Sequence, residues 1–121
     1  MSNIMIVDDS ITMRQMVNFT LASAGHKVTE AGNADEALAH AQTQRFDLVI
    51  SDVNMPGRTG IELVAELRKL PEYKFVPIIL LTTEAQPEMK SRGRTAGATG
   101  WIVKPFDPDA LLSVLRKVLP A

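Results

Sequence analysis

Short apolar runs alternate with longer stretches of helical periodicity along the chain. The apolar runs predict β-strands over residues 3–7, 48–50, 76–81 and 101–103, with a weaker strand over 27–30. Three of the five are apolar almost throughout, which is typical of strands that are covered on both faces of a sheet. We therefore expect a sheet that is buried between two layers.

The stretches between the runs predict five helices. Their apolar stripes lie within residues 13–24, 33–41, 59–70, 87–96 and 107–119. Helix starts are marked by Asn33, by Thr59 in a capping-box pattern, and by Asp107 before a proline.

Two of these helices have features of their own. In the first, Met13 and Met16 belong to the apolar stripe, and we expect both in the core. The fourth has few apolar positions, little more than Met89, Gly93 and Ala96. We therefore expect the fourth helix to be an element of low stability that can move.

The regular alternation of strand and helix predicts the fold class. Parallel strands need long crossover connections, and right-handed helical crossovers place helices on both faces of the sheet. We therefore expect an α/β protein with a doubly wound, five-stranded parallel sheet. Its 121 residues and 13.2 kDa correspond to one domain over residues 1–121, without a linker or a convincing repeat.

Composition and charge exclude several classes of function. Thirteen basic and fourteen acidic residues give a net charge of −1, so the charge balance does not point to nucleic acid as a partner. No apolar run is long enough to span a membrane, and the start of the chain lacks the features of a signal peptide. Cysteine is absent, which excludes disulfides and thiol chemistry and is compatible with the expected cytoplasmic location. His26 and His40 lack partners at ligand spacing and are expected at the surface.

Polar side chains follow four of the five predicted strands. Asp8 and Asp9 follow the first, Asp52 follows the third, the pair at 82–83 with Glu84 follows the fourth, and Lys104 follows the last. Ligands of open parallel sheets bind outside the carboxyl ends of the strands. We therefore expect these side chains to converge at one edge of the sheet.

This combination of residues indicates a site that handles phosphoryl groups. Neighbouring ionised carboxylates repel one another, and a set of oxygen ligands without His or Cys favours a hard cation such as Mg²⁺. Lys104 offers a positive charge and Thr82 a hydrogen bond to the oxygens of an anion. Asp52 is best placed as a nucleophile, because carboxylates can form acyl phosphates.

Each of these residues also has an ordinary structural explanation. Asp9 could cap the following helix, Asp52 could form a turn with the Pro-Gly pair at 56–57, and Lys104 could be a solvated strand end. The hypothesis of a functional site therefore depends on their joint placement at four strand ends.

Several segments together resemble the receiver domain of two-component response regulators, most closely the single-domain CheY-like chemotaxis regulators. The resemblance is carried by Ile-Val-Asp-Asp-Ser at 6–10, Asp-Leu-Val-Ile-Ser-Asp at 47–52, Met-Pro-Gly at 55–57, Leu-Thr-Thr-Glu at 81–84 and Ala-Gly-Ala-Thr-Gly-Trp-Ile-Val-Lys-Pro-Phe at 96–106. It covers essentially the whole chain and implies the flavodoxin-like receiver fold.

The resemblance implies a role for each matching residue. Asp52 corresponds to the phosphoacceptor. Asp8 and Asp9 correspond to the acidic pair that holds Mg²⁺, to which Asn54 contributes its backbone carbonyl. Thr82 corresponds to the hydroxyl that moves toward the phosphoryl group, and Lys104 to the lysine that pairs with its oxygens. The Lys104–Pro105 peptide bond is expected to be cis, as in relatives.

Two positions depart from the family pattern. Trp101 replaces the Tyr or Phe that is usual before the lysine, and the bulkier indole is expected to rotate inward less readily. Thr83 replaces a small residue and is expected to narrow the entrance to the site and slow small donors or water. Asn54 and Glu84 match the chemotaxis type at two positions that influence the lifetime of the phosphoryl group.

The implied function is that of a stand-alone response regulator, a phosphoacceptor switch that assists its own phosphorylation and dephosphorylation rather than an enzyme with an external substrate. Its implied partners are a chemotaxis-type sensor histidine kinase, an output protein such as the flagellar motor switch at the face of the fourth helix, fifth strand and fifth helix, and a phosphatase. A monomer is expected.

Four other functions are weighed against this one. A phosphate sink or a phosphorelay intermediate would use the same site without a motor output. A Mg²⁺-dependent phosphohydrolase is disfavoured because Asn54 stands where such enzymes carry a general acid. A pseudo-receiver that only binds partners is disfavoured because the acid pair, the acceptor and the lysine are all present.

Overall fold

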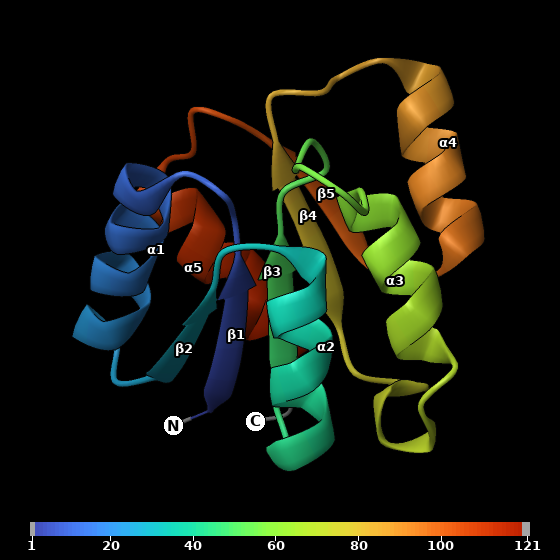
Figure 1. The fold of residues 1–121 in the computed structure, drawn as a ribbon. Helices are drawn as coiled ribbons and strands as arrows, with labels where there is room; N and C mark the ends of the chain where they lie inside the picture. The colour runs from blue at the N-terminus through green and yellow to red at the C-terminus, as the bar shows by residue number, and fades with distance from the viewer. Residues whose placement is uncertain (1, 120–121) are drawn as a thin grey trace.

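A computed structural model describes residues 2–119. Strands and helices alternate along this part of the chain in the predicted order (Figure 1). The strands are β1 (Asn3–Val7), β2 (Lys27–Ala31), β3 (Leu48–Ser51), β4 (Ile78–Thr82) and β5 (Gly100–Val103). The helices are α1 (Ile11–Ser23), α2 (Ala34–Thr43), α3 (Gly60–Arg68), α4 (Pro87–Ala96) and α5 (Pro108–Val118), with a 3-10 turn η1 (Pro71–Tyr73) before β4. None of these helices is long and apolar enough to cross a bilayer.

The five strands form one parallel sheet in the order β2-β1-β3-β4-β5. Val7 at the end of β1 is level with Ala31 in β2 and Ser51 in β3. The carboxyl ends of the strands therefore lie along one edge, and the residues that follow them are close in space. The predicted class, a doubly wound five-stranded parallel sheet, is confirmed.

Helices cover both faces of the sheet and create two hydrophobic cores (Figure 1). On one face, Val17 and Leu21 of α1 and Leu111 and Leu115 of α5 pack on the sheet. On the other face, the small residues of α2 and the aliphatic residues of α3 pack on it, and α4 lies against α3. Strands β1, β3 and β4 lie between these layers, which explains their nearly continuous apolar sequences.

The predicted helix starts of α2, α3 and α5 have the expected capping residues. Asn33 accepts a hydrogen bond from the backbone of the first turn of α2, and Asp107 does the same for α5. At α3, Thr59 and Glu62 form a complete capping box. For α1 the cap is Ser10, whose hydroxyl accepts from Met13 N at 3.2 Å. Asp9 is therefore not the N-cap of this helix.

The prediction for Met16 was wrong. Met13 packs against the core, but Met16 is 51% exposed, together with Ile11 at 62% and Phe19 at 75%. Successive residues of a helix are rotated by about 100°, so a helix that buries Val17 turns its neighbour toward solvent. Because α1 carries more apolar residues than its inward face can bury, part of the stripe remains exposed.

Strand β4 begins two residues later than the apolar run suggested. Pro77 has no N–H group and cannot donate to the sheet, although its carbonyl accepts from Val49 N at 3.0 Å. Earlier in the chain, residues 71–73 form η1, which the apolar pattern did not predict.

Candidate functional site

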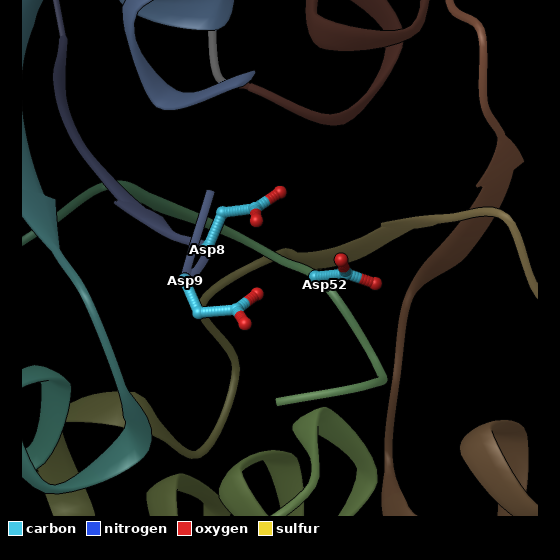
Figure 2. A group of neighbouring side chains, drawn as sticks. All are labelled: Asp8, Asp9 and Asp52. Atoms are coloured by element: carbon cyan, nitrogen blue, oxygen red, sulfur yellow. The ribbon is translucent and has the colours of Figure 1, made fainter. Parts of the chain in front are cut away.

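Three carboxylates meet at the carboxyl edge of the sheet. Asp8 and Asp9 directly follow β1, and Asp52 directly follows the adjacent strand β3. One oxygen atom of each carboxylate lies within 4.8 Å of the others (Figure 2). Asp8 and Asp52 are buried, with 3% and 9% exposure, whereas Asp9 is exposed. The cluster therefore has a buried base and one side open to solvent.

The Asp52 carboxylate is held in a fixed orientation. Its Oδ1 accepts from the backbone N–H of Val53 at 2.6 Å and from that of Asn54 at 3.4 Å. Its Oδ2 accepts from Lys104 Nζ at 2.9 Å. These bonds come from the loop that follows β3 and from the loop that follows β5, so the sheet edge itself positions the carboxylate.

Lys104 places its ammonium group between two of the carboxylates. Nζ lies 2.8 Å from Asp8 Oδ2 and 2.9 Å from Asp52 Oδ2, and the side chain is nearly buried. Burial lowers the pKa of Lys104, but the hydrogen bonds to the two carboxylates outweigh it and raise the pKa overall. The ammonium thus offsets the repulsion between the carboxylates. The Lys104–Pro105 peptide bond is cis, as expected.

Thr82 ends β4, the strand next to β3, and is fully buried. Its Oγ1 accepts from the backbone N–H of Glu84 at 3.1 Å, which fixes the start of the β4–α4 loop. Thr83, the next residue, is exposed.

Trp101 connects β5 to the same loop. Its Nε1 donates to the carbonyl oxygen of Glu84 at 2.8 Å, and the ring is partly buried against α4. Gly93 of α4 provides the space, because a Cβ atom there would lie 2.8 Å from Trp101 Cζ3. The bulky indole is therefore accommodated by a glycine in the facing helix.

The sequence pattern of the response regulator receiver domain matches residues 4–116. The chain belongs to this family. In this chain an acid cluster lies at the carboxyl edge of the sheet, with a lysine from the loop after β5.

Individual relatives support this assignment. A crystal structure of chemotaxis protein CheY4 from Vibrio cholerae is 55% identical, with a TM-score of 0.95, and the match covers 98% of this receiver and 99% of that chain. Chemotaxis protein CheY-3 from the same species is 40% identical, covering 95% of this receiver and 89% of the relative. Response regulator TrrA from Thermotoga maritima, solved with Mg²⁺ and BeF, is 36% identical, with a TM-score of 0.86 and coverage of 98% and 100%. The receiver also spans about half the length of several transcriptional regulators.

The donor atoms of the cluster fit a hard divalent cation. They are carboxylate oxygens from three residues, and no nitrogen or sulfur ligand joins them in the cluster. Mg²⁺ is bound by one or two carboxylates and retains several waters, which suits a cluster with one exposed member, Asp9.

One contact of the acid pair was not predicted from the sequence. The guanidinium of Arg14, in α1, donates to the backbone carbonyl of Asp8 and forms an ion pair with Glu30 of β2. The available signal was that Arg14 is the one charged residue in α1. A contact from a side chain to a backbone carbonyl has no motif of its own, so sequence patterns do not reveal it.

Proposed function

We propose that this receiver accepts a phosphoryl group on Asp52 from a sensor histidine kinase, with Mg²⁺ bound at the acid cluster, and thereby changes its binding to a separate protein. The observation that carries this proposal is the cluster of Asp8, Asp9 and Asp52 with the Lys104 ammonium between two of its members. Asp52 is the acceptor because its strand is the central one of the sheet and its carboxylate is already oriented.

The transfer is a displacement at phosphorus. An Asp52 carboxylate oxygen attacks the phosphorus of a phosphohistidine, the new O–P bond forms, and the N–P bond breaks with its electron pair going to the imidazole. Bound Mg²⁺ supplies neutralisation of the phosphoryl charge. Lys104 moves its ammonium from the carboxylate to a phosphoryl oxygen, which is a short shift at 2.9 Å from Asp52. Attack of water on the same phosphorus later releases phosphate and regenerates the carboxylate.

Phosphorylation would change the conformation of the receiver, because the new phosphoryl oxygens on Asp52 accept hydrogen bonds from side chains that now bond elsewhere. Turning toward a phosphoryl oxygen to donate its O–H would draw the Thr82 hydroxyl away from Glu84 N, from which it now accepts a hydrogen bond. The carbonyl of Glu84 also accepts a hydrogen bond from the Trp101 indole in β5, and this ring packs against Gly93 of α4. A shift of Glu84 would therefore also move β5 and α4. The output surface in this proposal is therefore the face formed by α4, β5 and α5.

The chemotaxis relatives favour a kinase of the chemotaxis type and an output protein such as the flagellar motor switch. The same proposal includes a phosphatase that shortens the lifetime of the acyl phosphate. It also includes a cytoplasmic location, a monomeric state and a single domain over residues 1–121. A phosphate sink or a phosphorelay intermediate remains the alternative.

Intact mass spectrometry after incubation with Mg²⁺ and acetyl phosphate tests the central step. The wild type should gain one phosphoryl group, and Asp52→Asn should gain none, because the amide is nearly isosteric but is not nucleophilic. Asp35→Asn makes the same chemical change at an exposed carboxylate and should behave as the wild type. Equal phosphorylation of Asp52→Asn would show that the acceptor lies elsewhere.

A pull-down with phosphorylated and unphosphorylated protein separates the two output hypotheses. A switch should capture the motor-switch protein mainly in the phosphorylated state. A phosphate sink should capture only its kinase, in either state.

A further inference from the structure

The backbone of Asp8 is held on both sides of its Cα atom. The Asp8 N–H donates to the carbonyl of Ala31 in β2 at 3.1 Å, and the Asp8 carbonyl accepts from Arg14 Nη1 at 2.5 Å. The second bond is made to the carbonyl of the peptide unit that joins Asp8 to Asp9. The guanidinium therefore sets the direction in which the Asp9 side chain leaves the backbone.

Asp9 depends on this backbone more than its neighbours do. Within residues 2–119 its carboxylate accepts no hydrogen bond, whereas Asp8 is tied by Ser10 N and Lys104, and Asp52 by Lys104 and two backbone N–H groups. Asp9 is also the exposed member of the cluster. Nothing but the course of the backbone keeps its oxygens near the others.

Arg14 is itself held firmly. Its Nε donates to Glu30 Oε1 at 3.0 Å, and its side chain is only 17% exposed. The second oxygen of Glu30 accepts from Asn18 Nδ2 at 2.8 Å, so two residues one turn apart on α1 fix the same carboxylate. Gly32 leaves room for the guanidinium, since a Cβ there would lie 3.3 Å from Arg14 Nη1. The Arg14 guanidinium therefore connects α1 to β2 and to the end of β1.

We propose that Arg14 is a positioning residue for the metal site: through the Asp8 carbonyl it holds Asp9 in the orientation that binds Mg²⁺. This inference rests on the proposed function, because it assumes that the acid cluster binds Mg²⁺. It adds a residue that touches neither the cation nor the phosphoryl group.

The electrostatic effect and the positioning effect of Arg14 predict opposite changes in Mg²⁺ affinity when its side chain is replaced. Loss of a nearby positive charge, which also leaves Glu30 unpaired, should strengthen the binding of a cation. Loss of the bond to the Asp8 carbonyl should weaken it, because the Asp9 oxygens are no longer held in place. The direction of the change in Mg²⁺ affinity therefore separates the two effects.

The test is calorimetric titration of Mg²⁺ into the unphosphorylated protein. Arg14→Met should bind Mg²⁺ about 10-fold more weakly, as is usual when a residue that orients a metal ligand is lost. Asn18→Ala removes a bond to Glu30 but leaves the contact to Asp8, so its Kd should stay within about twofold of the wild type. Hydrogen exchange of the Ser10 backbone amide, which donates to Asp8 Oδ1, should also be faster in Arg14→Met without any Mg²⁺.

Phosphorylation by acetyl phosphate provides a second readout. Arg14→Met should need about 10-fold more Mg²⁺ for the half-maximal rate but should reach the wild-type rate at saturation. If Arg14→Met fails to fold, Arg14→Lys tests the positioning role in its place. Lysine keeps the positive charge, but its ammonium cannot reproduce the planar, forked geometry with which the guanidinium donates to Glu30 and to the Asp8 carbonyl at the same time. Arg14→Lys should bind Mg²⁺ measurably more weakly than the wild type.

The outcomes are distinguishable. Wild-type or tighter Mg²⁺ binding by the folded variant, or an equal loss in Asn18→Ala, would overturn the role of Arg14 alone. Failure of the wild type to bind Mg²⁺ would overturn the proposed function and this inference with it.

Discussion

Lys104 carries much of the charge balance of the receiver. Its ammonium lies within 2.9 Å of two buried carboxylates that would otherwise face each other without a cation. Removing one partner of a buried ion pair leaves an uncompensated charge and typically costs about 3–5 kcal/mol. The side chain therefore stabilises the fold as well as serving the proposed phosphoryl transfer.

Lys104→Met should consequently lower the free energy of unfolding in urea by about 3 kcal/mol at neutral pH without Mg²⁺. Added Mg²⁺ should restore part of this loss, because it supplies positive charge at the same carboxylates. Lys27→Met changes an exposed lysine and should leave the stability within about 0.5 kcal/mol of the wild type. A small loss in Lys104→Met would mean that the carboxylates are neutralised by other means.

At the scale of elements, α4 is attached differently from the other helices. Its one buried residue is Gly93, and Gln86, the N-cap residue before the helix, makes no side-chain capping bond. At this glycine the helix lies close to Trp101 of β5 and to Leu80 of β4, since a Cβ atom there would be 2.8 Å from Trp101 Cζ3 and 3.1 Å from Leu80 Cδ1. This supports the expectation of a weakly held helix, and it identifies the indole as the contact through which β5 and α4 affect each other.

Gly93→Ala tests this contact. Alanine favours a helix by about 1 kcal/mol over glycine, but here its Cβ would overlap Trp101, and overpacking costs roughly 1–3 kcal/mol. We expect a net loss of stability and a red-shifted fluorescence of the single tryptophan as the indole leaves its place. Ser91→Ala at an exposed position of the same helix should gain slightly in stability without a spectral change. An unshifted spectrum in Gly93→Ala would argue against the packing role.

The sequence predicted most elements because apolar periodicity and capping residues act locally. It also indicated which side chains would meet, since parallel strands necessarily bring Asp8, Asp52 and Lys104 to one edge. It could not predict that Met16 would remain exposed, because the rotation of α1 depends on how the helix packs against β2 and β1. The Gly93–Trp101 contact was likewise hidden, because it joins elements whose separation only the folded chain determines.

At the scale of the whole molecule, alkaline pH should destabilise the fold through two groups at opposite edges of the sheet. Burial lowers the pKa of Lys104, but its hydrogen bonds to Asp8 and Asp52 raise this pKa overall. Burial raises the pKa of Tyr73. In the folded state each group keeps its proton at a pH where the unfolded chain has lost it. Their stabilisation is therefore complete below the unfolded pKa values near 10 and is lost as pH rises through the folded ones.

Urea unfolding between about pH 8 and pH 11 measures this effect. The wild-type free energy of unfolding should fall steadily above about pH 10. Lys104→Met and Tyr73→Phe should start from lower stabilities but show a shallower decline, since each lacks one of the titrating groups. A decline as steep as in the wild type in both variants would assign the effect to other residues.

The backbone of Glu84 is bonded on both sides by the two residues that would respond to phosphorylation. Its N–H donates to Thr82 and its carbonyl accepts from Trp101. Because both bonds converge on one residue, a displacement of Glu84 disturbs them together. We therefore expect Thr82 and Trp101 to move in concert, with graded signals encoded by the fraction of molecules switched rather than by partly switched molecules.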